Sequence, residues 1–197
     1  MIPQNFIYLA ALINFFGFLS YLTSTLKGRT KPNRVTFFIW SLAPFIASAA
    51  QIASGVGLST LGVFIIGFGP FLILLASFYN PNAYYQLHRM DYFCGFFAAL
   101  GLIFWMQTKN ANLAILCSII TEIFAAIPTF VKISKAPETE NGLYYVCGLV
   151  GLVITFLCVQ DKSFAGYAFI SFAILMYALL AISVYGAQKL RSPQQSG

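Results

Sequence analysis

The chain has 197 residues, of which 59% are hydrophobic and only 8% are charged, whereas soluble domains carry roughly 25% charged residues. Its net charge is +6, and it contains one histidine and four cysteines without a CxxC pair. These figures exclude a soluble nucleic-acid-binding domain, and they provide neither a metal-ligand cluster nor a nucleophile–base pair for an enzyme. We therefore expect a membrane protein without a metal or cofactor.

Apolar runs recur along the whole chain and leave no segment for a soluble domain. Most of them reach the roughly 17–25 residues that a membrane-spanning helix needs, whereas the fourth and the sixth are shorter. The runs predict seven membrane-spanning helices: Phe6–Leu26, Val35–Ser54, Leu58–Phe78, Tyr92–Met106, Asn112–Val131, Leu143–Val159 and Phe164–Ala187. Because the connections are only a few residues long, we expect a compact all-α bundle with little outside the membrane.

The basic residues predict how this bundle is oriented. Four of them crowd the first connection: Lys27, Arg29, Lys31 and Arg34. If the N-terminus is outside, the cytoplasmic side also receives Arg89, Lys132, Lys135, Lys189 and Arg191, and the outer side receives Lys109 and Lys162. The positive-inside rule therefore predicts N-out and C-in, and the cytoplasmic excess predicts contact with anionic membrane lipids. The chain has no Asn-x-Ser/Thr sequon, which favours a bacterial inner membrane.

The sequence also contains an internal repeat. When the chain is shifted by 105 residues, the first three predicted helices align with the last three without a gap. Lys27 then aligns with Lys132, and Pro32 aligns with Pro137. One helix lies between the triplets, so the two repeats have the same orientation, as in transporters whose repeats are related by an axis along the membrane normal. We therefore divide the chain into a first triple-helix bundle (1–88), a linker helix (89–108) and a second bundle (109–197).

This arrangement resembles the SWEET and PQ-loop superfamily, whose members have three helices, a linker helix and three more helices. The Pro-Gln signature of that family is half kept in the second bundle, where Thr129 follows Pro128, whereas the first bundle has Thr23 and Ser24 at the equivalent positions. The resemblance implies a transporter that moves a small polar solute, sugar-like or another small metabolite, by alternating access. The KDEL-receptor branch of the superfamily implies the alternative, a non-transporting membrane receptor or accessory protein of the same fold.

Glu122 is the one carboxylate in the apolar stretch from Asn112 to Val131. An ionised side chain at this depth costs about 2.5–3.5 kcal/mol on insertion scales, so chains that keep one usually direct it toward a cavity, a partner or a proton path. We expect Glu122 either to bind the solute or to take up a proton. The alternative is a protonated glutamic acid that hydrogen-bonds to a neighbouring helix and stabilises the bundle.

Helical spacing indicates which other residues line a central path. The candidate residues for binding a solute or a proton are Glu122, Asn14, Ser118, Gln51, Trp40 and Tyr21. Plain helix packing and, for Trp40, an interfacial position are the alternatives. Three prolines within the predicted helices, Pro44, Pro70 and Pro128, are candidate hinges or static kinks, because each removes a backbone hydrogen bond. The expected partners are a small-molecule solute and membrane lipids, and a homo-oligomer is compatible with the sequence.

Overall fold

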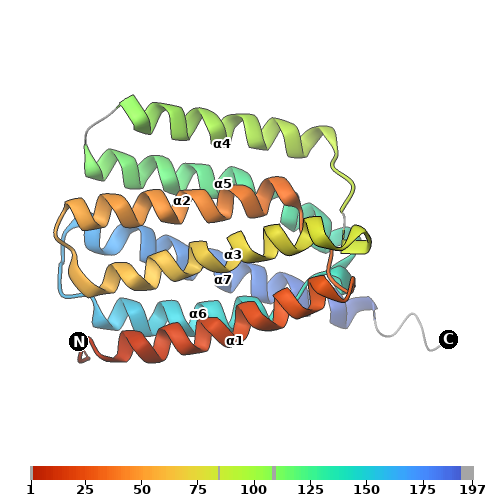
Figure 1. Ribbon diagram of the computed structural model, residues 1–197, viewed down its shortest axis with the longest axis horizontal. Coiled ribbons are helices and arrows are strands. Elements are labelled where there is room, and N and C mark those ends of the chain that lie inside the picture. Colours follow the sequence, from red (N-terminus) through yellow and green to blue (C-terminus); the bar gives the residue numbers. More distant parts are fainter. Residues whose placement is uncertain (1, 84, 108–109, 192–197) are drawn as a thin grey trace.

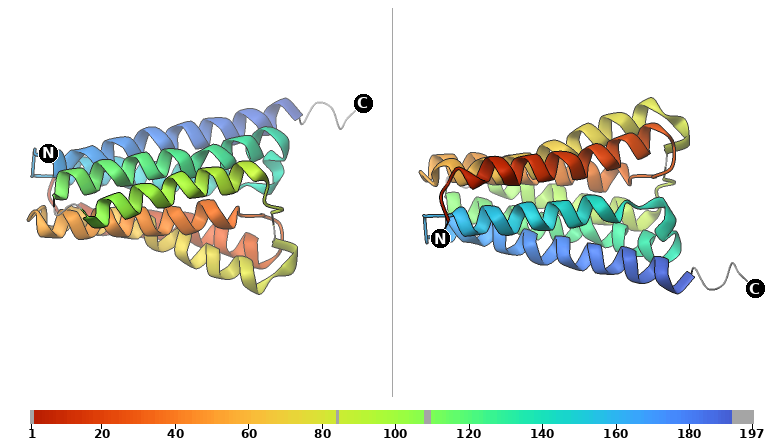
Figure 2. Two further views of the ribbon diagram at one scale, coloured as in Figure 1. Left: turned by 90° about the horizontal axis from the view of Figure 1, so that it is seen from above. Right: turned by 90° about the horizontal axis from the view of Figure 1, so that it is seen from below.

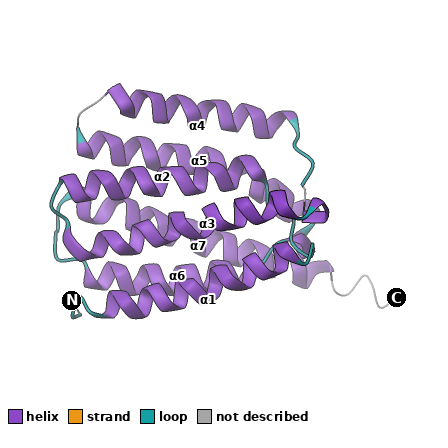
Figure 3. Cartoon of the chain, in the orientation of Figure 1, coloured by secondary structure: helices purple, strands orange, loops and turns teal. Residues whose placement is uncertain are grey.

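The computed structural model describes residues 2–83, 85–107 and 110–191, and this part of the chain is a bundle of α-helices without a β-strand (Figure 3). Its seven α-helices are α1 (Phe6–Leu26), α2 (Arg34–Ala53), α3 (Thr60–Tyr79), α4 (Arg89–Gln107), α5 (Ala111–Lys135), α6 (Gly142–Cys158) and α7 (Phe164–Arg191). Helices α1, α2, α3, α5 and α7 are long and apolar enough to cross a membrane, and α6 is a shorter apolar helix. The prediction of a multi-pass helical membrane protein is confirmed at this level. Lys109, which the predicted topology places outside, is not among the described residues.

Asparagine side chains set the starts of three helices. Asn33, Asn110 and Asn141 each have extended backbone angles, and their side chains accept hydrogen bonds from backbone N–H groups in the first turns of α2, α5 and α6. These N–H groups have no partner inside the helix, so an asparagine at this position stabilises the start. Helix α4 begins at Arg89, three residues before the predicted start, and Asp91 in its first turn accepts a hydrogen bond from the His88 N–H. A carboxylate there is favoured by the positive end of the helix dipole.

Successive helices run in opposite directions, so α1, α3, α5 and α7 all end at the same end of the bundle (Figure 1). Nine lysines and arginines lie in or beside the connections at this end, which we call the basic end: Lys27, Arg29, Lys31, Arg34, Arg89, Lys132, Lys135, Lys189 and Arg191. The other end carries Lys162 in the connection between α6 and α7.

Six of the helices form a closed ring of contacts, and α4 lies outside this ring. Helix α3 packs against both α1 and α2, and α7 packs against both α5 and α6. The contacts of α1 with α6 and of α2 with α5 complete the ring. Helix α4 packs against α5 and less extensively against α2. It lies at the edge of the bundle in Figure 1 and in front of the other helices in the left view of Figure 2.

Small residues allow several of these helices to approach closely. Gly17 of α1 faces Cys147 of α6, and Gly148 of α6 faces the ring of Tyr177 on α7. Gly67 of α3 lies against Pro44 of α2, where an added Cβ would be 3.1 Å from the proline Cβ. Glycine at helix contacts is the common way to pack helices in a membrane, because the backbones can approach without a side chain between them.

Candidate functional site

Glu122 lies in the interior of the bundle on α5, with 8% of its surface exposed. It borders a small cavity inside the bundle. The lining residues come from α2, α3, α5 and α7: Trp40, Pro44, Ile66, Glu122, Phe169, Phe172, Ala173, Met176, Tyr177 and Leu180. The cavity measures about 10 Å³, which is room for about one water molecule. The site is therefore closed in this arrangement of the helices.

The lining of this cavity combines four aromatic and five other apolar residues with one carboxylate. Glu122 is the one charged residue among the lining residues, and its Oε1 has no hydrogen-bond partner in the described part of the chain. The indole Nε1 of Trp40 is also buried without such a partner. The Tyr177 hydroxyl, by contrast, is hydrogen-bonded to the Tyr144 hydroxyl at 3.0 Å. A buried carboxylate oxygen without a partner is costly in an apolar interior, so this arrangement is unlike a purely structural contact.

Aromatic rings connect this cavity to the basic end. The ring centroids of Trp40 and Tyr145 are 6.4 Å apart, and those of Trp40 and Phe37 are 5.5 Å apart. Tyr21 of α1 continues the series, with its centroid 5.1 Å from that of Phe37 and 5.4 Å from that of Tyr144. These rings fill the space between the cavity and the basic end, and they separate Glu122 from the charged groups there.

A fully buried ion pair closes the bundle at the basic end. The Lys132 Nζ of α5 lies 2.5 Å from Oε1 of Glu140, which precedes α6, and both side chains have 0% exposure. The hydroxyls of Tyr21 and Tyr145 each donate to Oε2 of Glu140 at 3.0 Å. Lys132 Nζ also donates to the backbone carbonyl of Lys31. The network therefore joins α1 and the connection that follows it to α5 and to the start of α6.

Two of the charged residues in this network were not predicted as site residues. Lys132 supported only the predicted orientation and the repeat, and Glu140 lies between the predicted helices that end at Val131 and begin at Leu143. Nothing in the apolar pattern indicates that the connection after Pro137 turns Glu140 into the bundle. The one available signal is that Lys132 and Glu140 flank the same short connection with opposite charges, and that signal is weak.

The other predicted site residues lie outside the Glu122 cavity. Asn14 is buried against Gly151 of α6, and its Nδ2 has no hydrogen-bond partner in the described residues. Gln51 is fully buried, and its Nε2 donates to the carbonyl of Ala165 at 3.0 Å. Ser118 donates to the Ala114 carbonyl of its own helix. The structure thus brings together Glu122, Trp40 and the proposed hinge Pro44, whereas Tyr21 belongs to the Glu140 network.

The proposed hinge prolines all lie inside continuous helices. Pro44 is in α2, Pro70 is in α3 and Pro128 is in α5. All three are buried. Each leaves one backbone carbonyl of its helix without the usual partner, so a hinge role for these positions stays a prediction.

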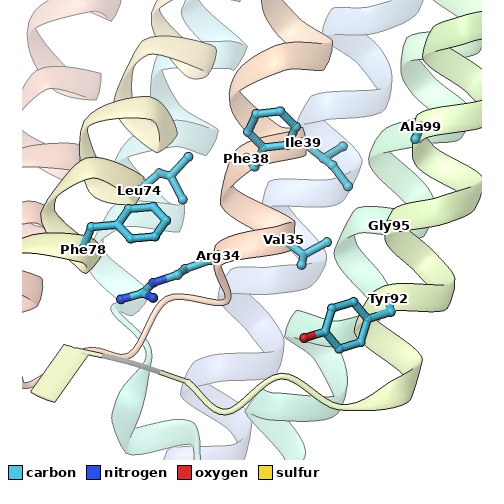
Figure 4. A pocket seen from close by; sticks show the side chains of 9 residues that line it. All are labelled: Arg34, Val35, Phe38, Ile39, Leu74, Phe78, Tyr92, Gly95 and Ala99. Atoms are coloured by element: carbon cyan, nitrogen blue, oxygen red, sulfur yellow. The ribbon is translucent and has the colours of Figure 1, made fainter. Parts of the chain in front are cut away.

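A second and larger hollow lies near the basic end, between α2, α3 and α4 (Figure 4). Its volume is about 430 Å³, and none of the predicted site residues lines it. Figure 4 shows Val35, Phe38 and Ile39 on its α2 side and Tyr92 on its α4 side. Arg34 is also at this hollow, but its guanidinium donates to the Ser77 hydroxyl and carbonyl and lies 4.1 Å from the Phe78 ring centroid. The hollow is therefore apolar and faces the outside of the bundle, where lipid is the expected neighbour.

No protein-family model, no curated protein and no solved structure matches this chain. The likeness to the SWEET and PQ-loop superfamily therefore stays a prediction that depends on the arrangement of the helices and on the repeat.

Proposed function

We propose that this protein is a membrane transporter that moves a small polar solute by alternating access, with Glu122 in the solute site. The observation that carries the proposal is the buried Glu122 carboxylate, which has an unpartnered oxygen at a closed cavity between α2, α3, α5 and α7. A permanent structural role would pair that oxygen. A transport site needs such a group free in the empty state, so that the solute or a proton can bind to it.

The proposal includes the arrangement of the chain as two parallel three-helix repeats joined by α4. The pattern of helix contacts supports this arrangement, because the main contacts among these six helices, apart from those of α4, are unchanged when α1, α2 and α3 are exchanged for α5, α6 and α7. In both halves the third helix lies between the first and the second. The contact of α1 with α6 likewise corresponds to that of α5 with α2.

Two hydrogen bonds support the repeat with its offset of 105 residues. The Thr36 hydroxyl of α2 donates to the carbonyl of Ala125 on α5 at 2.9 Å. At the equivalent positions of the other half, Asn141 at the start of α6 donates to the Ser20 hydroxyl of α1 at 3.0 Å. Each half therefore contacts the other through the same pair of positions, as expected for two repeats around a common axis.

Alternating access would require the two halves to separate at one end and then at the other. The Lys132–Glu140 network joins the two halves at the basic end, so it is the contact that would open there. The nine basic residues at this end support placing it in the cytoplasm, with the N-terminus outside, in a bacterial inner membrane.

The test is solute uptake by proteoliposomes that contain the purified protein. Radiolabelled glucose, alanine and choline represent neutral, zwitterionic and cationic solutes, and each is measured with and without an imposed pH gradient. We expect at least one of them to enter faster than it enters protein-free liposomes, and Glu122→Gln to slow this uptake by more than about tenfold. If the wild-type protein binds a probe but moves none of them, the transport proposal is wrong and the receptor alternative is favoured.

A further inference from the structure

The electrostatic character of the Glu122 cavity restricts the kind of solute it can bind. Its walls include the rings of Trp40, Phe169, Phe172 and Tyr177, and its one charged group is the carboxylate of Glu122. The faces of aromatic rings carry partial negative charge, so rings around a carboxylate attract a cation and repel an anion. Lys132, the cation of the buried network at the basic end, is already paired with Glu140.

The same lining argues against a sugar. A sugar needs several hydrogen-bond partners, because each of its hydroxyls loses a bond to water when it is buried. Among the lining residues only the Glu122 carboxylate, the Trp40 N–H and the Tyr177 hydroxyl are polar, and the Tyr177 hydroxyl is already bonded to Tyr144. One carboxylate and one free donor suit a ligand with a single charge and an apolar body.

We propose that the solute of this site is a small organic monocation, an amine or a quaternary ammonium ion, and that it competes with a proton for Glu122. This inference rests on the proposed transport function and adds the class of the solute. The cation would sit against the Glu122 carboxylate and the faces of Trp40 and Tyr177. In the closed, empty state a proton takes its place, because an ionised carboxylate in the bilayer interior needs a counter-charge.

Few other groups near Glu122 would contribute to a pH dependence. Of the helices around it, α2 presents Trp40, which does not titrate, whereas α7 and α6 present the tyrosines Tyr177 and Tyr144, within electrostatic reach of Glu122. The described titratable residues of α4 are in its first two turns near the basic end: Arg89, Asp91, Tyr92 and Cys94. The pH series is repeated in a His88→Gln variant, because His88 is the one histidine of the chain.

The test compares ligands of the same shape and different charge. Choline is the cation, 3,3-dimethylbutan-1-ol is its neutral isostere and 3,3-dimethylbutanoate is the anion, and methylammonium and tetramethylammonium extend the series to smaller sizes. The chain has two tryptophans, so Trp105→Phe leaves Trp40 as a fluorescence reporter at the cavity. Binding is measured in detergent by quenching of this fluorescence and, for variants of Trp40, by thermal stabilisation.

We expect the cations to bind at least about tenfold more tightly than the neutral isostere, and the anion not to bind. Apparent affinity for the cation rises as the pH is raised from 5.5 to 7.5, because fewer protons compete for Glu122. Glu122→Gln weakens cation binding by more than about tenfold and removes its pH dependence, whereas His88→Gln retains both. Trp40→Phe keeps most of the affinity, and Trp40→Leu loses it. Glu138→Gln, at an exposed carboxylate of the basic end, is the matched control and binds like the wild type.

Equal binding of choline and its neutral isostere, binding of none of the cations, or a Glu122→Gln variant with unchanged affinity overturns this inference. The proposed function fails in a different way. If cations bind as expected but do not cross the membrane of proteoliposomes, the cation site stands and transport is wrong. If glucose or alanine is transported while no cation binds, transport stands and the inference about the solute is wrong.

Discussion

Three carboxylates inside the bundle show how their surroundings give similar side chains different roles. Glu140 is ion-paired with Lys132 and accepts hydrogen bonds from two tyrosines. Asp91 is buried at the start of α4, where it accepts from the Asn33 side chain at 2.8 Å. Glu122 alone has an oxygen without a partner at a cavity. The first two are therefore structural contacts between segments, and Glu122 is the group available to a ligand.

The Lys132–Glu140 pair predicts a large difference between two conservative substitutions. Glu140→Gln leaves the buried Lys132 ammonium without a counter-charge, and removing one partner of a buried pair costs about 3–5 kcal/mol. Glu138→Gln is the control, since Glu138 pairs with Arg191 at 3.5 Å and their side chains are 65% and 45% exposed; such pairs contribute about 0–1 kcal/mol. Unfolding of both variants in detergent micelles measures the free energy change. Equal stability of the two variants would contradict the role of the buried pair.

Asp161 predicts how the start of α7 responds to acid. The Ser163 hydroxyl and backbone N–H both donate to its carboxylate, and these bonds hold the pKa of Asp161 below its ordinary value. A group with a lowered pKa in the folded state stabilises it above the ordinary pKa, and this contribution is lost as the pH falls through the lowered value. We expect the first turn of α7 to open below about pH 4, measured by amide hydrogen exchange at Gly166. Ser163→Ala should move this opening to higher pH; an unchanged profile would contradict the explanation.

At the scale of the elements, the sequence predicted the helices well and their contacts poorly. All seven predicted runs overlap observed helices, because apolar stretches bounded by polar connections and capping asparagines specify a membrane helix locally. Helix α5 continues to Lys135, four residues beyond its predicted end. Which helix faces α1 depends on side chains that are distant in sequence, so the contact of Gly17 with Cys147 could not be read from the helical pattern.

The glycines at helix contacts predict where added volume is not tolerated. Gly148→Leu places a side chain where the Tyr177 ring lies against α6, and overpacking of this kind costs about 1–3 kcal/mol. Gly186 of α7 is the matched control, because nothing lies within 4 Å of a Cβ built there. Gly186→Leu should therefore retain or slightly raise stability, since leucine favours a helix more than glycine does. Thermal unfolding in micelles compares the two variants, and equal losses would contradict the contact.

At the scale of the whole molecule, the candidate site was only partly predictable. Glu122 was identified because a charge in an apolar run is conspicuous, and Trp40 because it shares a helix face with Pro44. Glu140 was missed because its burial depends on the path of a connection, which hydropathy does not describe. Asn14 and Gln51 looked similar to Glu122 in the sequence, but each faces a different helix contact. Polar residues in a membrane helix thus indicate the interior without indicating which interior site they share.

If the proposed transport function holds, the contact between the two halves at the basic end predicts that a covalent bond there stops transport. The Lys31 N–H donates to the Thr139 carbonyl at 3.1 Å, so the two residues are close enough for a disulfide, whose Cα atoms lie about 4.4–6.8 Å apart. In a background without the four native cysteines, the double variant Lys31→Cys, Thr139→Cys should lose uptake on oxidation by more than about tenfold and recover it with dithiothreitol, because a site that cannot open at the basic end cannot pass its solute from one side to the other.

The control for this lock is a disulfide within one half. Thr25 and Thr30 both belong to the first half, and their hydroxyl oxygens are 2.9 Å apart. A Thr25→Cys, Thr30→Cys bond leaves the contact between the halves free, so uptake should continue after oxidation, with the bond itself verified by mass spectrometry. Full uptake through a protein whose residues 31 and 139 are cross-linked would contradict alternating access by separation of the halves. The two disulfides together therefore distinguish a loss of uptake caused by locking the halves from a loss caused by oxidation or by a disulfide as such.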